Sequence, residues 1–389
     1  MLAPSRASLN GLDVLALVVR PAVDWEALLS EAAACRKLAD RRSAELKLPP
    51  VNRPVRSKET DAPWWRFRWH EPAPCVGPSD TVSTSSMIAL TGATGFIGAY
   101  LLRELTAAGH AVRVLLRRPT PLPVSCTNAV IGDLDRPVNM AAALAGISTI
   151  IHSAGLSSPM SGAPEVDFRR LNAEATRNLA RSAERAGVRR FIFLSSVRAQ
   201  ADVSSNLILT EDLAPAPTDS YGRSKLMAEQ QLAALELDWI ALRLPLVFGP
   251  GVKGNMATLV KLARSALPLP FGALRARRSL LSLDNLLSAI SLLMKSPEPI
   301  RRPFLVADPT PLSIPEMIEA MRAGIGRRPG LLRIPPPLLR MVLRASNRDD
   351  LYRRLAEPLV VDPSRMLEKG WTPRLETREA LARVARLTP

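Results

Sequence analysis

Tyr221 and Lys225 are the two side chains whose type and spacing most directly suggest chemistry. They stand four residues apart in "DSYGRSKLMAEQ" (219–230), and the chain has only three tyrosines. On a helix, positions four apart lie on one face, so the ammonium can lie near the phenol. A phenol titrates near about 10, and a neighbouring positive charge lowers that pKa toward the neutral range. The same spacing also suits an ordinary exposed pair, so the motif needs support from the rest of the chain.

A glycine-rich turn predicts a phosphate-binding loop. "TGATGFIG" (91–98) places Gly92, Gly95 and Gly98 after an aliphatic run and before a helical stretch. Glycines here permit a tight turn, close approach of the backbone to a pyrophosphate, and close packing of helix on strand. The N-terminus of the following helix, around Phe96 and Ile97, offers free N–H groups to the anion. Strand, turn and helix in this order predict a dinucleotide site.

Two arginines bear on which dinucleotide binds. An NAD site commonly has a carboxylate about twenty residues after the glycine loop, where it holds the ribose 2′-hydroxyl. This chain instead reads "LLRRP", with Arg117 and Arg118. Guanidinium groups there suit a 2′-phosphate, which favours NADP over NAD. A plain surface pair is the alternative.

The elements that must position these residues alternate along the chain from Met87. Short apolar runs (among them "MIALTG", "STIIHSAG" and "RRFIFLSSV") are separated by helical stretches of ten to fifteen residues. This pattern predicts an α/β fold with a doubly wound parallel Rossmann sheet over 87–249. The alternation lapses after Pro250, so 250–389 is predicted to be mainly a smaller substrate-binding region. Residues 1–86 are Pro-rich without a period, and we expect a weakly ordered, dispensable extension. The alternative is a docking tail that uses the cluster of Trp64, Trp65 and Trp69.

Bulk properties narrow the class of protein. The formal charge of +16 comes mostly from dispersed arginines, without a nucleic-acid module, so we expect a solvated basic surface and no nucleic-acid partner. Three scattered cysteines and three histidines predict neither a disulfide framework nor a metal site. No apolar run is long enough to span a bilayer, although "PPPLLRMVLRASNR" (335–348) is compatible with a peripheral membrane contact. We expect a cytoplasmic protein.

From Met87 onward the chain resembles an extended short-chain dehydrogenase/reductase of the NAD-dependent epimerase/dehydratase family. The resemblance covers about three hundred residues and rests on several motifs in order. The positions that it assigns to the cofactor are Gly92, Gly95, Phe96, Ile97, Gly98, Asp133 and Leu134 in "GDLD", Ser153, Ala154 and Gly155 in "HSAG", Asn172 in "LNAEAT", Tyr221, Lys225, and Pro245 in "LRLPLVFGPG". Within this set, Asp133 is expected to bind the adenine and Pro245 to lie beside the nicotinamide.

The resemblance also implies the catalytic and substrate-binding residues. Ser196 in "FLSSV" would donate to a substrate oxygen, Tyr221 would act as acid and base, and Lys225 would lower the tyrosine pKa and hold the nicotinamide ribose. The tyrosine pKa is expected to fall because of Lys225 and the positive nicotinamide together. Asn255 in "FGPGVKGN" and Arg278 in "RRSLLSLDN" would contact a nucleotide-diphosphate sugar, because an arginine fork suits a pyrophosphate.

The reaction is left between two readings. Dehydratases of this family carry Asp–Glu after the active-site hydroxyl, whereas Ser196 is followed by Val197 and Arg198, so dehydration is disfavoured. A UDP-sugar C4 epimerase and a nucleotide-sugar 4-ketoreductase both use the remaining machinery. A steroid or flavonoid alcohol dehydrogenase and a non-catalytic dinucleotide sensor are the alternatives outside this class. Relatives are often dimers, so a homodimer is expected.

Overall fold

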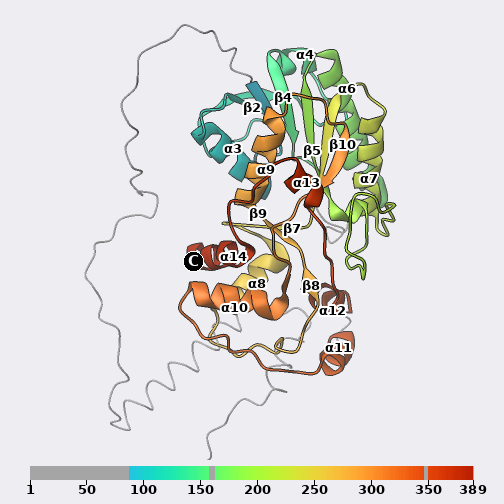
Figure 1. The fold of residues 1–389 in the computed structure, drawn as a ribbon. Coiled ribbons are helices and arrows are strands. Elements are labelled where there is room, and N and C mark those ends of the chain that lie inside the picture. The colour runs from blue at the N-terminus through green and yellow to red at the C-terminus, as the bar shows by residue number, and fades with distance from the viewer. Residues whose placement is uncertain (1–86, 157–162, 346–348, 389) are drawn as a thin grey trace, which may run out of the picture. The chain divides into compact units, whose positions relative to one another are not determined.

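A seven-stranded parallel sheet organises the first half of the structure (Figure 1). The computed structural model describes residues 87–156, 163–345 and 349–388, all within one compact unit of the chain. In the order in which they pair, the strands are β10 (Arg302–Leu305), β6 (Asp238–Leu244), β5 (Arg190–Ser196), β4 (Ile147–His152), β1 (Met87–Thr91), β2 (Val112–Leu116) and β3 (Thr127–Val130). The predicted Rossmann fold class is confirmed. The predicted extension, 1–86, lies outside the described residues.

Helices cover both faces of the sheet because alternate strand residues point to opposite sides. Ile192 and Leu194 of β5 belong to a core shared with α3 (Phe96–Ala107) and α9 (Leu283–Lys295). Phe191 and Phe193 pack on the other side, in a core shared with α4 (Met140–Leu144), α6 (Ala175–Arg185) and α7 (Ser220–Ala233). Burial on both faces explains why the strands read as continuous apolar runs in the sequence.

The strand order reverses beside β1. Strands β2 and β3 lie on one side of it, and β4, β5, β6 and β10 lie on the other. In open α/β sheets, ligands bind at the carboxyl ends of the strands next to such a reversal. The glycine loop after β1 and the "HSAG" segment after β4 both lie at this edge.

Pro245 divides the apolar run "WIALRLPLVFG" (239–249) between two strands. Strand β6 ends at Leu244, and β7 (Leu246–Phe248) leaves the large sheet to pair with β9 (Leu280–Ser282). The reason is that proline has no N–H to donate to a ladder. The chain therefore enters its C-terminal part directly after Pro245.

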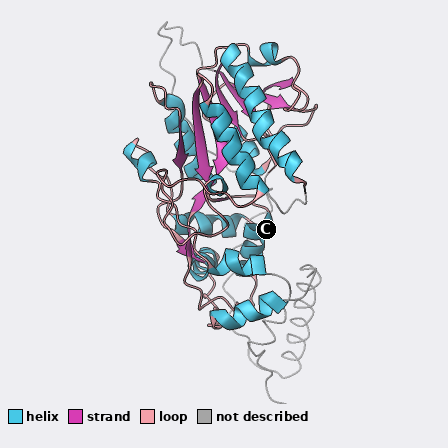
Figure 2. Ribbon diagram, turned by 90° about the vertical axis from the view of Figure 1, so that its right-hand side faces the viewer, coloured by secondary structure: helices cyan, strands magenta, loops and turns pink. Residues whose placement is uncertain are grey.

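The C-terminal part has its own apolar core, below the sheet in Figures 1 and 2. Its strands β8 (Arg277–Arg278) and β11 (Leu312–Ser313) pair antiparallel. Its helices are α8 (Gly254–Arg264), α10 (Ile314–Gly324), α11 (Pro336–Ala345), α12 (Asp349–Ala356) and α14 (Thr377–Leu387). Helix α13 (Ser364–Glu368) instead packs through Met366 into the core of the large sheet. Strand β10 returns from this part of the chain to pair with β6. No helix among the described residues combines the length and apolar character needed to cross a membrane.

Candidate active site

The glycine loop is shaped so that only glycines fit. Gly92 has φ of 72°, and an ideal Cβ there would lie 2.7 Å from the Ala154 nitrogen. A Cβ at Gly98 would lie 2.1 Å from the Gly92 carbonyl oxygen, so helix α3 begins directly against the turn. The cap residue Gly95 has no side chain to bind the first N–H groups of α3, and the first turn carries no acidic residue. These features fit a pyrophosphate at the helix N-terminus.

A buried polar network joins the loop to the neighbouring strand. The Thr91 hydroxyl accepts hydrogen bonds from the backbone N–H groups of Ser153 and Ala154, each at 3.2 Å, and lies 2.7 Å from His152 Nδ1. His152 Nε2 lies 3.0 Å from the Thr176 hydroxyl. Burial, with a smaller effect from Lys225, lowers the pKa of His152 to about 3, so the ring is neutral. His152 is therefore structural, and the sequence motifs singled out neither it nor Thr91.

Asn172 lies in a π-helical turn, η2 (Arg169–Glu174), between the short helix α5 (Glu165–Phe168) and α6. Its side chain accepts from Leu156 N–H at 2.8 Å and donates to the Ser224 hydroxyl of α7 at 3.0 Å. A Cβ at Gly155 would lie 2.7 Å from Asn172 Oδ1 and 3.9 Å from Lys225 Nζ. The structure thus brings together the three predicted residues Gly155, Asn172 and Lys225.

Lys225 is a buried ammonium at the carboxyl end of β5. Its Nζ donates to the Leu194 carbonyl at 2.8 Å and lies 4.5 Å from the centre of the Phe193 ring. Burial lowers its pKa to about 8, and the carboxylate of Glu229 opposes that shift. The group is therefore mostly charged at neutral pH and close to its titration range.

Ser196 and Tyr221 meet at the same edge. Ser196 is the last residue of β5, and its hydroxyl lies close enough to Tyr221 to affect the pKa of the phenol. Burial raises the pKa of Tyr221, while the Ser196 hydroxyl and the charge of Arg198 oppose the rise. The sequence prediction of a lowered pKa relied on Lys225 and the nicotinamide together. In the protein alone the pKa of Tyr221 is raised, because burial outweighs the effects that lower it.

Three residues that the sequence motifs did not single out fix the start of α7. Asp219 caps the helix by accepting from Gly222 N–H at 2.6 Å, and Arg198 bonds to the same carboxylate at 2.5 Å. Gly222 follows Tyr221 and packs so closely that an added Cβ would lie 2.2 Å from the Arg198 carbonyl oxygen. An Asp just before an amphipathic stretch is a recognisable helix-start signal. The close approach at Gly222 has no such signal.

The remaining predicted cofactor residues differ in their exposure. Arg117 follows β2 and lies 3.6 Å from Asp133, and both side chains are mostly exposed. Arg118 is exposed, while Leu134 packs against the apolar core on the α6 side. Pro245 is buried between β6 and β7.

The two predicted substrate residues lie in the C-terminal part. Asn255 is exposed in the first turn of α8. Arg278 donates from its two Nη atoms to the carbonyls of Glu357 and Val203, at 2.7 and 2.8 Å. Burial and the nearby charges of Arg354 and Arg198 lower its pKa to about 10. The charge of Arg198 also acts on Tyr221, so Arg278 lies on the side of the site that these two residues share.

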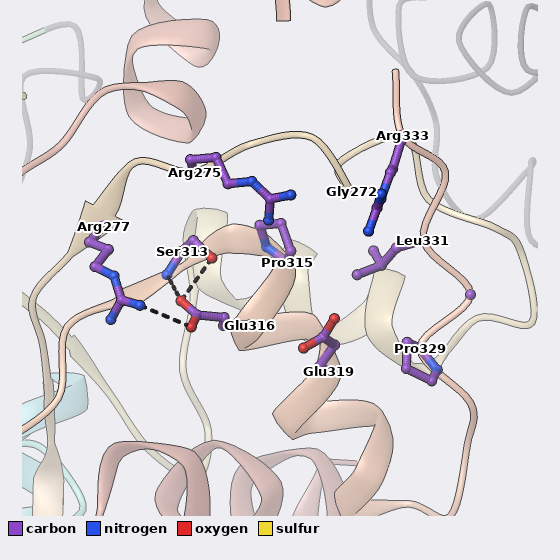
Figure 3. Close-up of a pocket in the computed structure, with 11 residues that line it drawn as sticks. Gly272, Arg275, Arg277, Ser313, Pro315, Glu316, Glu319, Pro329, Leu331 and Arg333 are labelled. Atoms are coloured by element: carbon purple, nitrogen blue, oxygen red, sulfur yellow. Dashed lines mark hydrogen bonds and ion pairs between the residues drawn. The ribbon is translucent and has the colours of Figure 1, made fainter. Parts of the chain in front are cut away.

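A separate cavity of about 600 Å³ opens on the opposite side of β8 (Figure 3). Arg277, the neighbour of Arg278, lines it and bonds to Glu316, whose carboxylate also caps α10. None of the predicted site residues lines this cavity. Among the described residues, no group of three or more His, Cys, Asp or Glu side chains could hold a metal ion.

Glycine cradle, helix N-terminus and Ser–Tyr–Lys cluster together define a dinucleotide-dependent enzyme class. The model of the NAD dependent epimerase/dehydratase family matches residues 88–307, more than half of the chain. The chain therefore belongs to this family, and the resemblance predicted from the motifs is confirmed.

Individual relatives agree with this assignment. A UDP-glucose 4-epimerase from Vibrio cholerae is 32% identical over 314 residues, covering 77% of this chain and 94% of that protein. A 3 beta-hydroxysteroid dehydrogenase/Delta 5-->4-isomerase from Mycobacterium tuberculosis is 29% identical, covering 74% of this chain and 83% of that protein. Among solved structures, MoeE5 in complex with UDP-glucose and NAD is 26% identical with a TM-score of 0.61, covering 78% of this chain and 98% of MoeE5.

Proposed function

We propose that the protein is a C4 epimerase of a nucleotide-diphosphate sugar that works on bound NAD, with Tyr221 as acid and base. The observation that carries the proposal is the meeting of Ser196, Tyr221 and Lys225 at the carboxyl end of β5, beside a glycine cradle. The length over which the chain matches a UDP-glucose 4-epimerase supports the choice of substrate class.

Each residue has a defined task in this reaction. The chemistry that a bound nicotinamide dinucleotide supplies is hydride exchange with C4 of the sugar. Tyr221 takes the proton from the 4-hydroxyl as the C4–H bond breaks, and returns it to the ketone oxygen when hydride comes back. Ser196 donates a hydrogen bond to the same oxygen. Lys225 holds the ribose hydroxyls and, with its charge, favours the phenolate form of Tyr221.

A 4-ketoreductase that consumes NADPH is the second candidate. Arg117 and Arg118 follow β2, where a 2′-phosphate would lie, and this position favours NADP. The ion pair of Arg117 with Asp133 leaves Arg118 as the more accessible guanidinium. NAD remains the proposed cofactor because the family is NAD-dependent and MoeE5 binds NAD.

One incubation separates the two reactions. The protein is mixed with UDP-glucose, UDP-N-acetylglucosamine or a UDP-4-keto sugar, with and without added NADPH. A C4 epimer formed without net consumption of cofactor supports the epimerase. Oxidation of one NADPH for each product molecule supports the reductase, and no reaction with any nucleotide sugar overturns the substrate class.

The steroid-dehydrogenase relative gives a third reading, an alcohol dehydrogenase for an apolar substrate. The feature that argues against it is Arg278, a mostly buried guanidinium whose charge a pyrophosphate would complement and an apolar substrate would not. Arg278→Met should weaken binding of a UDP-sugar and leave binding of NAD unchanged. If a 3β-hydroxysteroid is oxidised and the nucleotide sugars are not, the third reading holds.

Two further proposals concern partners. Helix α11 exposes Met341 and lies in a segment, residues 325–345, with five arginines and no acidic residue, which suits a peripheral contact with anionic lipid. Sedimentation with phosphatidylglycerol vesicles tests this contact, and phosphatidylcholine vesicles are the control. The proposed homodimer is tested by light scattering.

A further inference from the structure

Three successive residues at the end of β5 each face a different turn of α7. Ser196 lies close enough to Tyr221 to affect its pKa, and the Leu194 carbonyl accepts from Lys225 at 2.8 Å. Between them, the Ser195 hydroxyl donates to Glu229 Oε1 at 2.5 Å. Tyr221, Lys225 and Glu229 are spaced by four, so they form one stripe of α7 that faces β5.

Glu229 is the deepest member of this stripe and forms an ion pair with Arg243. The two side chains are each 4% exposed, and Arg243 Nη2 lies 2.7 Å from Glu229 Oε2. Arg243 Nε also donates to that oxygen at 3.1 Å, and Nη1 donates to the Gln200 side-chain carbonyl at 3.0 Å. Arg243 lies on β6, in register with Ser195 of β5. The carboxylate thus ties α7 to two neighbouring strands.

We propose that Glu229 is a positioning residue for the catalytic pair: anchored by Arg243 and Ser195, it sets the register of α7 on β5 and places a negative charge one turn from Lys225. The inference rests on the proposed function, because it assumes that Lys225 acts as an ammonium. A one-residue slip of α7 would turn Tyr221 by about 100° away from Ser196, so the register matters directly.

The charges around Lys225 give the pair a second effect. The groups near Lys225 are Glu229 from its own helix, the neutral His152 from β4, the Leu194 carbonyl and Phe193 ring from β5, and Asn172 from η2. Tyr221 precedes it by one turn of the helix. Glu229 is the one carboxylate that counters the burial of the ammonium. Loss of that charge would let the pKa of Lys225 fall further, so the group would become neutral at a lower pH.

The same two strands contain a matched control pair at their other end. Arg190 begins β5 and Asp238 begins β6, and their side chains are 2.7 Å apart and buried. Helix α7 takes no part in that ion pair, whose other contacts are backbone groups: Arg190 donates to carbonyls of 293–298, and Asp238 accepts from Ile300 N–H at 2.7 Å. Asp238→Asn and Glu229→Gln each leave a buried arginine beside a neutral amide, so both lower stability. Only Glu229→Gln also alters the surroundings of Lys225.

The test measures NAD binding by calorimetry across pH, together with kcat, KM and Tm, in the full-length chain. Glu229→Gln should move the alkaline loss of NAD affinity to lower pH by about half a unit or more, and lower kcat. Glu229→Asp keeps the charge but shortens the side chain. It should therefore lose NAD affinity over the same alkaline pH range as the wild type (the alkaline limb of the binding profile), while kcat falls. Asp238→Asn should lower Tm without moving the limb.

Two outcomes would overturn the proposal. One is an unchanged alkaline limb and kcat in Glu229→Gln, and the other is an equal shift of the limb in Asp238→Asn. If Glu229→Gln does not fold, the double variant Glu229→Gln/Arg243→Met, which leaves no unpaired buried charge, must show the same shift. The binding measurement needs no sugar substrate, so a wrong substrate class would leave this test intact.

Discussion

Replacement of Gly222 by alanine tests whether close packing at the start of α7 sets the catalytic geometry. Gly222 has no positive φ, and alanine is favoured over glycine within a helix by about 0.8–1 kcal/mol. The added Cβ, however, would lie 2.2 Å from the Arg198 carbonyl oxygen and 3.1 Å from Asp219 Oδ1. Side-chain Cβ atoms do not approach other atoms within 3.0 Å, so helix and turn must separate.

The helix and the turn must separate by roughly 0.8 Å, and this movement would change the distance between Tyr221 and Ser196. A misplacement of about 1 Å at a reacting centre costs on the order of 100-fold in rate. Gly222 follows Tyr221, and Arg198 stands two residues after Ser196. We therefore expect Gly222→Ala to lower kcat by about 10- to 100-fold, with overpacking that costs about 1–3 kcal/mol of stability. NAD affinity should change little, because the glycine cradle after β1 is untouched.

The assay is kcat per folded molecule, with NAD affinity and Tm measured in parallel. Gly324→Ala is a control for overpacking, because its Cβ would lie 2.5 Å from the Ala382 carbonyl, where α10 contacts α14. It should lower Tm and leave kcat unchanged. If Gly222→Ala keeps kcat within about threefold of the wild type, the packing at Arg198 does not set the distance between Ser196 and Tyr221 and the reasoning fails.

Four other changes have defined outcomes. Tyr221→Phe should keep NAD binding and lower turnover by about 100- to 10,000-fold, measured by product formation; near-normal turnover would remove the proposed acid and base. Arg117→Ala with Arg118→Ala should weaken NADPH more than NADH in binding titrations, and equal losses would mean that neither side chain reads the 2′-phosphate. A chain that begins at Met87 should bind NAD and melt within a few degrees of the full-length protein, whereas aggregation would show that 1–86 stabilises the enzyme. Burial raises the pKa of Asp308 to about 6, so wild-type stability should fall as pH rises from about 4 to 6; denaturant unfolding of Asp308→Asn should lack that contribution, and equal slopes would refute it.

The parts of the site that could be predicted from sequence are those with local signals. The glycine loop is recognisable from the spacing of its glycines and from its place between a strand and a helix. Tyr221 and Lys225 are recognisable because their spacing matches the period of a helix. The strands could be predicted because burial on both faces of the sheet makes each strand a continuous apolar run in the sequence. The division at Pro245 could also have been read, because proline cannot donate to a ladder.

The residues that hold the site in place were not predictable, because their partners are distant in sequence. Gly222 packs against the Arg198 carbonyl, 24 positions earlier in the chain. Glu229 pairs with Arg243, which lies on the strand after α7. Periodicity shows that Glu229 shares a face with Lys225, but not that the face is buried against two strands. The burial that raises the pKa of Tyr221 in the protein alone could not be predicted either, since burial is a tertiary property.

Arg198 bears on which reaction the site can support. A dehydratase needs a further acid and base close to the hydroxyl of Ser196, yet the 3-10 turn that follows, η3 (Val197–Ala199), supplies an aliphatic side chain and a guanidinium. The guanidinium is bound to Asp219 at 2.5 Å and to Asp202 at 3.2 Å, and Asp202 is held in turn by Arg353 at 2.7 Å. Burial alone would raise the pKa of Asp202, but the hydrogen bonds that it accepts from Arg353 and Val203 outweigh burial and lower the pKa to about 2. The Asp202 carboxylate is therefore charged and a poor proton donor at neutral pH. Under the proposed function, Tyr221 would then be the group that exchanges protons with the sugar, and this favours chemistry confined to one carbon, as C4 epimerisation requires.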